Sequence, residues 1–192
     1  MGRKIGILGG TFDPPHLAHL MIAQEAMDAC TLNEVWFIPT SIPPHKQNED
    51  MASVNDRVEM TRLAISNRSS FRLCTIELDR KGPSYTLDTI NILKRAYAND
   101  EFYFIIGSDM AVSLHTWNGI EELKKLVTFI VTTRPDYGVD SPFEEAFIKV
   151  HVPEMELSSS DIRERVKNNE SIRYLVPEVV RTYVEENRLY GS

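Results

Sequence analysis

Cysteine is scarce in this sequence, and so are the features of a secreted or membrane protein. Only Cys30 and Cys74 occur among 192 residues, and their spacing fits neither a disulfide framework nor a zinc ribbon, so we expect both to be buried free thiols. No apolar stretch approaches the length needed to cross a bilayer, and the N-terminus enters a strand-like segment without the apolar run of a signal peptide. We therefore expect a cytoplasmic protein with no membrane partner.

Positive charge is also in short supply. The chain has 21 Lys and Arg against 28 Asp and Glu, and its formal net charge of −7 argues against a protein that coats nucleic acid with a basic face. The sequence has no internal repeats and no low-complexity runs. Its 42% hydrophobic and 26% charged residues are typical of a globular protein, and the length suits one domain covering residues 1–192.

The most informative stretch is residues 4–19, KIGILGGTFDPPHLAH. The apolar run at 5–8, bounded by glycines, predicts a buried strand. The glycine pair at 9–10 predicts a sharp turn in which no Cβ prevents a close approach, and the prolines at 14–15 mark the start of a helix. The stretch therefore predicts a strand, a glycine turn and a helix, with His16 and His19 one turn apart where the helix begins.

This arrangement favours phosphate as a ligand. A glycine turn and a helix N-terminus present free backbone N–H groups and partial positive charge, and two imidazoles on one face would add donors. The glycine spacing matches neither G-x-G-x-x-G nor G-x-x-x-x-G-K-[ST]. Two alternatives stay open. The glycines could form an ordinary tight turn, and the histidines could bind a metal, although no nearby Cys or carboxylate cluster completes such a site.

The rest of the chain alternates between predicted strands and helices. Strands are expected at 35–39, 71–74, 102–106 and 127–133, and at 148–152, where apolar and polar residues alternate as in a strand with one solvated face. A helix is expected at 53–67, where Ser53 and Asp56 resemble a capping box. A second is expected after a turn at 82–86, with Thr86 as its N-cap. Further helices are expected around 120–126, at 158–166 and from Pro177. Residues 136–145 are expected to form a loop. This alternation predicts an α/β fold with a doubly wound, mainly parallel, Rossmann-like sheet.

In a sheet of this kind the ligand binds beyond the carboxyl ends of the strands. Four separate segments lie at those ends: Gly9-Gly10, the proline-rich stretch from Pro39 to Lys46, Gly107 to Asp109, and Arg134. Their convergence on one edge predicts a binding site there.

A second candidate phosphate site is the helix start at residues 158–163, SSSDIR, with three serines and Arg163 one turn further on. Serines are also ordinary helix caps, so this segment taken alone is ambiguous. The same holds for three other candidates. Read alone, Lys46 is a surface residue, Trp117 a core residue and Asp109 a turn residue.

Residues 9–19 resemble the G-T-F-D-x-x-H-x-G-H signature of a nucleotidyltransferase superfamily, and residues 158–163 resemble its S-S-T-x-x-R signature. Ala18 stands where the first signature has glycine, and Ser160 stands where the second has threonine and keeps the hydroxyl. Further matches narrow the resemblance, over nearly the whole chain, to the bacterial nicotinate-nucleotide adenylyltransferases; they lie at residues 43–46, 82–86, 107–109, 116–117 and 187–190. Asn118 departs from the aromatic residue usual in that family.

The resemblance implies transfer of AMP from ATP to nicotinate mononucleotide by direct in-line attack, giving nicotinate adenine dinucleotide and pyrophosphate in NAD biosynthesis. It implies Mg²⁺ held mainly by ATP phosphates, no protein metal site, and four catalytic residues, which are His16, His19, Lys46 and Arg163. The residues implied for ATP binding are Gly9, Gly10, Thr11, Phe12, His16, His19, Gly107, Asp109, Arg134, Ser158, Ser159, Ser160 and Arg163. Those implied for the mononucleotide are Lys46, Ser84, Tyr85, Thr86, Asp109 and Trp117.

Two other functions stay open. One is another adenylyltransferase of the superfamily, such as one acting on phosphopantetheine, whose chains are usually shorter and lack the features at 82–86 and Trp117. The other is a non-catalytic nucleotide sensor on the same fold. Both histidines and the Ser-rich Arg segment weigh against a sensor, since a sensor need not bind a leaving pyrophosphate. We expect no nucleic-acid partner, and a homo-oligomer stays open.

Overall fold

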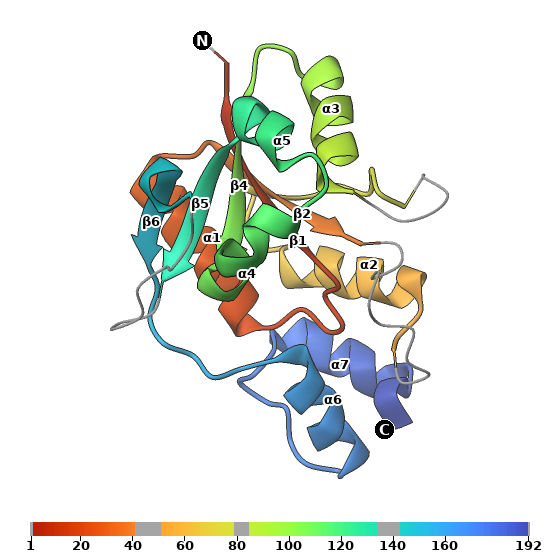
Figure 1. The fold of residues 1–192 in the computed structure, drawn as a ribbon. Coiled ribbons are helices and arrows are strands. Elements are labelled where there is room, and N and C mark those ends of the chain that lie inside the picture. Colours follow the sequence, from red (N-terminus) through yellow and green to blue (C-terminus); the bar gives the residue numbers. More distant parts are fainter. Residues whose placement is uncertain (1, 41–50, 79–84, 134–142, 192) are drawn as a thin grey trace.

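The computed structural model describes residues 2–40, 51–78, 85–133 and 143–191. Its centre is a sheet of six strands in the order β3-β2-β1-β4-β5-β6 (Figure 1), in which every neighbouring pair is parallel. The strands are β1 (Lys4–Gly10), β2 (Glu34–Pro39), β3 (Phe71–Leu73), β4 (Glu101–Gly107), β5 (Thr128–Thr133) and β6 (Phe147–His151). The predicted doubly wound α/β fold is confirmed.

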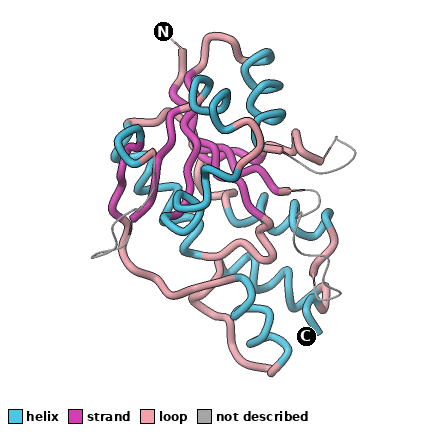
Figure 2. Tube along the Cα trace, viewed as in Figure 1, coloured by secondary structure: helices cyan, strands magenta, loops and turns pink. Residues whose placement is uncertain are grey.

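Helices connect the strands and lie on both sides of the sheet, as the colouring of Figure 2 shows. They are α1 (Leu17–Cys30), α2 (Val54–Ala64), α3 (Thr86–Ala96), α4 (Ser108–Ser113), α5 (Ile120–Leu126), α6 (Ser159–Lys167) and α7 (Glu178–Glu186). Short 3-10 turns are η1 (Leu114–Thr116), η2 (Glu144–Ala146) and η3 (Leu189–Gly191). The predicted β1-α1-β2 unit is present, and its strands are buried on both faces because helices cover both.

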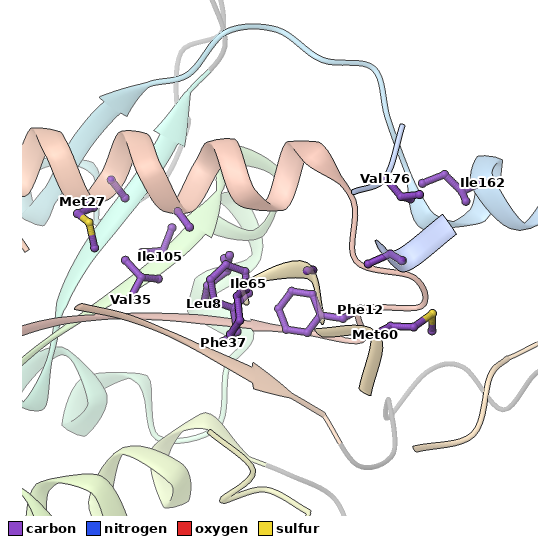
Figure 3. Close-up of a cluster of buried hydrophobic side chains, with 14 of the residues drawn as sticks. Leu8, Phe12, Met27, Val35, Phe37, Met60, Ile65, Ile105, Ile162 and Val176 are labelled. Atoms are coloured by element: carbon purple, nitrogen blue, oxygen red, sulfur yellow. The ribbon is translucent and has the colours of Figure 1, made fainter. Parts of the chain in front are cut away.

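Two hydrophobic cores lie on opposite faces of the sheet, because successive side chains of a strand point in opposite directions. The first, here called the α1 core, joins the strands to α1, α2, α6 and α7 and is drawn in Figure 3; it includes Leu8, Phe12, Met27, Val35, Phe37, Met60, Ile65, Ile105, Ile162, Val176 and Tyr190. The second, the α3 core, joins them to α3, α4 and α5; it includes Ile5, Ile7, Trp36, Ile38, Ile90, Phe102, Phe104, Leu114, Leu123 and Phe129.

The glycine pair does not form the predicted turn. Gly9 and Gly10 are the last residues of β1 and still align with Ile38 and Pro39 of β2. The chain turns later, at Phe12, whose φ is +50°. A Cβ on Gly10 would lie 3.1 Å from the Phe12 ring, so the missing side chain makes room for this ring rather than for the turn itself.

Four smaller predictions also need correction. Cys30 and Cys74 are half-buried rather than buried, because Cys30 is the last residue of α1 and Cys74 follows the edge strand β3. Thr86 is the first residue of α3, and Tyr85 is the N-cap. Ile148 is 38% exposed because β6 is the other edge strand. Within the predicted loop at 136–145, residues 144–145 belong to η2 and residues 136–142 lie outside the described residues.

Candidate active site

A pocket of about 770 Å³ opens at the carboxyl ends of the strands. Its walls come from the β1–α1 loop, the beginning of α4, the end of β5, the segment after β6, and the first turn of α6. The strand order reverses between β1 and β4, and doubly wound sheets bind ligands at this reversal. The pocket therefore lies where the topology predicts a ligand.

Phe12 anchors the β1–α1 loop to the α1 core. The ring of Phe12 is 1% exposed and packs in the α1 core at 5.7 Å from the Phe37 ring (Figure 3). Its other edge meets the His19 ring at 5.1 Å, with the two ring planes 74° apart. A buried aromatic ring thus holds the His19 imidazole from the core side.

His16 and His19 begin α1 as a reciprocal pair. His16 is the N-cap, and its backbone N–H donates to Nδ1 of His19 at 3.2 Å. The two imidazole rings stack with centroids 3.7 Å apart. Because Nδ1 of His19 accepts a hydrogen bond, the neutral ring carries its proton on Nε2, which can donate to a ligand.

Burial keeps both imidazoles neutral in the absence of ligand. It lowers the pKa of His16 to about 4, and the carboxylate of Asp161 opposes this only in part. The pKa of His19 is lowered well below its usual value, first by burial and then by the neighbouring His16. An anionic ligand beside the pair would favour the charged forms, so these groups can meet a phosphate as neutral donors or as cations.

The Ser-rich segment closes the pocket from the other side. Ser158 is the N-cap of α6 and accepts the backbone N–H of Asp161 at 3.1 Å. The Ser159 hydroxyl donates to the Pro14 carbonyl at 2.9 Å, and Arg163 Nη1 donates to the Asp13 carbonyl at 2.8 Å. These bonds join α6 to the β1–α1 loop across about 150 residues, so the two predicted phosphate segments share one pocket.

A short helix after β4 supplies a further wall. Gly107 ends β4, and Gly107, Ser108 and Asp109 all line the pocket. A Cβ at Gly107 would lie 2.5 Å from Oδ1 of Asp109, so glycine permits this carboxylate to turn back over the strand end.

Of the residues assigned to the mononucleotide, Asp109 lines this pocket and three other described residues do not. Tyr85, Thr86 and Trp117 do not line it. Trp117 packs edge-on against Phe104, with ring centroids 5.9 Å apart. Two residues beyond Trp117, Gly119 approaches α3 so closely that a Cβ there would lie 2.4 Å from Leu87. The start of α3 and the Trp117 segment are thus neighbours at one end of the sheet.

The sequence is similar to known nucleotidyltransferases over nearly the whole chain. Residues 7–165 match the cytidylyltransferase-like family model. The nicotinate-nucleotide adenylyltransferase of Bacillus subtilis is 50% identical over 190 residues, which cover 99% of this chain and 100% of that protein. A probable nicotinate-nucleotide adenylyltransferase of Geobacillus thermodenitrificans is 53% identical over 189 residues, 98% of this chain and 87% of the relative. The chain belongs to the nicotinate-nucleotide adenylyltransferase family.

Solved structures agree with the fold of this adenylyltransferase family member. A Plasmodium falciparum nicotinic acid mononucleotide adenylyltransferase complexed with NaAD superposes with a TM-score of 0.81 at 23% identity, covering 98% of this chain and 97% of that one. The same Plasmodium protein complexed with APC gives a TM-score of 0.79.

Nucleotidyltransferases of this kind typically use a divalent metal. In the part of the chain that the structure describes, no group of three or more His, Cys, Asp or Glu could hold a metal ion. The polar side chains that line the pocket include two imidazoles, four serines and a guanidinium, together with the carboxylates of Asp13 and Asp109. Its hydrogen-bond donors suit the phosphates of a metal–nucleotide complex better than a bare cation. Among the described residues, a helix that could span a membrane is absent.

Three residues assigned to the site of this adenylyltransferase, Lys46, Ser84 and Arg134, lie outside the described residues. Gly9 and Gly10 are not among the pocket-lining residues, although the adjoining Thr11 and Phe12 are. The remaining ATP-side residues line the pocket together: Thr11, Phe12, His16, His19, Gly107, Asp109, Ser158, Ser159, Ser160 and Arg163.

Sequence reasoning missed several residues that shape the pocket. Val152, Pro153, Met155 and Leu157 form an apolar stretch of its wall between β6 and α6. Arg57, on α2, is 1% exposed, and its Nη1 donates to the carbonyls of Thr11 and Thr40, at 2.8 and 2.9 Å. One signal was available for Arg57, since it falls on the buried face of α2 together with Met60, Thr61 and Ala64.

Proposed function

We propose that this chain transfers AMP from ATP to nicotinate mononucleotide, giving nicotinate adenine dinucleotide and pyrophosphate. One observation carries the proposal. His16, His19, Arg163 and the amide-rich start of α6 face one pocket at the reversal point of the sheet, with donors arranged for a chain of phosphates. Residues 1–192 would act as one nucleotidyltransferase domain on small nucleotides rather than on nucleic acid, in the cytoplasm.

The proposed reaction needs no covalent step on a protein side chain. The phosphate monoester of the mononucleotide is anionic at neutral pH and can attack the α-phosphate of ATP in line, without a general base and without a covalent intermediate. The new P–O bond forms as the bond to pyrophosphate breaks, and negative charge gathers on the leaving oxygens. Catalysis then consists of positioning the two substrates and stabilising this charge.

Each part of the pocket would have a task. His16 and His19 would donate to the α-phosphate region, and Arg163 with the α6 serines would hold the departing pyrophosphate. Mg²⁺ would enter bound to ATP and would neutralise charge on its phosphates. Lys46, which follows β2 in the sequence, and Arg134, which follows β5, would add positive charge.

The acceptor half would lie toward α3. Tyr85 and Thr86 stand at the N-terminus of α3, and Ser84 precedes them in the sequence; free N–H groups at a helix start favour an anion such as the nicotinate carboxylate. Trp117, close to this helix start, would stack on the pyridine ring, and Asp109, which lines the pocket, would contact both substrates.

The test is pyrophosphate release from ATP and Mg²⁺ with a panel of acceptors. We expect turnover with nicotinate mononucleotide and none with phosphopantetheine. Equal turnover with phosphopantetheine would assign a different adenylyltransferase activity, and ATP binding without turnover on any acceptor would indicate a sensor.

A further inference from the structure

The carboxylate of Asp13 is the point where four distant segments meet beneath the pocket. Its side chain is 1% exposed. Oδ1 accepts from the Tyr190 hydroxyl at 2.7 Å and from the backbone N–H of Ala52 at 3.1 Å. Oδ2 accepts no hydrogen bond among the described residues and faces Nη1 of Arg163 at 3.6 Å.

Arg163 is held between Asp13 and the pocket. Nη1 donates to the Asp13 backbone carbonyl at 2.8 Å, and Nη2 lies 3.3 Å from the Ser160 hydroxyl. At 3.6 Å the contact with Oδ2 is an ion pair without a hydrogen bond. The guanidinium therefore keeps donors that the carboxylate has not taken, and it lines the pocket with them.

Tyr190 reaches Asp13 from η3, a turn that follows α7 and packs on both α6 and α7. Its ring is 9% exposed within the α1 core, and its backbone has a φ of +60°, an uncommon conformation for a residue with a Cβ. Burial and the adjoining carboxylate raise the pKa of its hydroxyl far above the usual value, so the hydroxyl remains a donor.

We propose that Tyr190 is a positioning residue for ATP, whose hydroxyl satisfies Oδ1 of Asp13 and so leaves Arg163 available to the phosphates. Arginine and carboxylate groups prefer a bidentate fork of two parallel hydrogen bonds. With the hydroxyl present, one oxygen of Asp13 is occupied and this fork does not form. Without it, Asp13 draws Arg163 down into a fork and away from the pocket.

This inference rests on the proposed function only in assigning Arg163 to ATP. The variant Tyr190→Phe keeps the buried ring and removes only the hydroxyl. Tyr183→Phe is the matched control, because the Tyr183 hydroxyl also donates to a carboxylate of α2, Asp56, at 2.9 Å, yet neither residue lines the pocket.

We expect Tyr190→Phe to raise the KM for ATP on the order of tenfold, as the loss of one charged hydrogen bond does. The KM for nicotinate mononucleotide should stay within about twofold, and Tyr183→Phe should leave both constants near wild type. Equal changes in both constants, or equal effects of the two variants, would make Tyr190 a structural residue and overturn the proposal.

A double-mutant cycle tests the route through Arg163. In the Arg163→Ala background, Tyr190→Phe should change the dissociation constant for Mg-ATP by less than about twofold, because the group it positions is gone. An undiminished effect would overturn the proposal. Asp13→Asn offers a second route, because it keeps an acceptor for Tyr190 but removes the charge that faces Arg163. In the Asp13→Asn background no charge remains to draw Arg163 from the pocket, so Tyr190→Phe should change the dissociation constant for Mg-ATP by less than about twofold, and an undiminished loss would contradict the mechanism.

These measurements test the role of Tyr190 separately from the proposed reaction. Mg-ATP binding, followed by calorimetry or by the rise in melting temperature, reports on Tyr190 whichever acceptor is used. If wild type releases no pyrophosphate with nicotinate mononucleotide, the proposed function fails while the binding comparison still decides the role of Tyr190.

Discussion

His16 and His19 are titratable residues whose pKa values are lowered by burial. Their rings stack on each other, the His19 ring also meets Phe12 edge-on, and His16 is only 5% exposed. The site therefore holds two neutral donors whose protonation can change when an anion arrives. Chemical consequences of this burial can be measured at single residues.

Removal of the His19 imidazole should affect the transition state more than the ground state. We expect His19→Ala to lower kcat on the order of 10²-fold or more, as the loss of one positioned donor does in other enzymes. ATP binding should weaken much less. His151→Ala, an exposed histidine at the end of β6, is the control. If His19→Ala lowers only the melting temperature and keeps a near-normal kcat, His19 is a structural residue.

The same burial makes stability depend on pH. The pKa of His16 is about 4 in the folded protein and 6.5 in the unfolded chain, so between these values the unfolded chain binds more protons. The free energy of unfolding should therefore fall as pH falls from about 6.5 to about 4, by up to roughly 3 kcal/mol for this residue, and be fully retained above 6.5. Urea unfolding at a series of pH values measures this. The slope should shrink in His16→Gln, and an unchanged slope would contradict the assignment.

At the scale of elements, the pocket is assembled by contacts between segments rather than by any one of them. Arg57 ties the carboxyl ends of β1 and β2 together through Thr11 and Thr40, while α6 is fastened to the β1–α1 loop. The guanidinium of Arg57 is buried, and burial lowers its pKa even though Asp13 opposes the shift. Such a group is retained for the backbone carbonyls it satisfies.

Arg57→Met should expose the cost of leaving those carbonyls without a donor. We expect the free energy of unfolding to fall by roughly 2–4 kcal/mol, since each unsatisfied buried group costs about 1–3 kcal/mol. Arg62→Met on the same helix is the control, because the Arg62 side chain is 54% exposed and its pair with Glu59 should contribute less than about 1 kcal/mol. If chemical denaturation shows similar losses of unfolding free energy in the two variants, Arg57 does not stabilise the carboxyl ends of β1 and β2.

Sequence predicted the elements better than it predicted their junctions. The β1-α1-β2 unit and helices α6 and α7 follow from local periodicity and caps, and Ser53 and Ser158 cap their helices as expected. The turn at Gly9-Gly10 was wrong because pairing with β2 extends β1 through both glycines. Arg57 and Tyr190 were missed because their roles depend on residues 46 and 177 positions away, respectively.

At the scale of the whole molecule, we expect two separate groups of residues to bind ATP and the acceptor. The pocket beside α6 is lined by the groups proposed to bind phosphate, whereas Tyr85 and Thr86 at the start of α3 and Trp117 do not line it. An acceptor bound toward α3 would present its phosphate to the pocket. Specificity for the acceptor and binding of ATP should therefore respond to different substitutions.

We expect the enzyme to prefer nicotinate mononucleotide to nicotinamide mononucleotide. Backbone N–H groups at the start of α3 would pair with a carboxylate, whereas an amide –NH₂ would leave them unpaired, at roughly 1–3 kcal/mol each. Two such contacts imply at least a tens-fold preference in kcat/KM. Trp117→Ala should weaken both substrates alike, and Thr86→Ala should retain the preference because the selective groups are backbone. Comparable kcat/KM values for the two mononucleotides would refute the carboxylate pocket.

The bond between Tyr190 and Asp13 spans 177 positions of the chain. While the protein is being made, the ribosome adds residue 13 long before residue 190, so a growing chain holds Asp13 without its hydroxyl partner. Proteins acquire such distant contacts late. A nascent chain that has not yet been translated through η3 therefore keeps Asp13 without this hydrogen bond, and its β1–α1 loop lacks one of the contacts that the finished fold gives it.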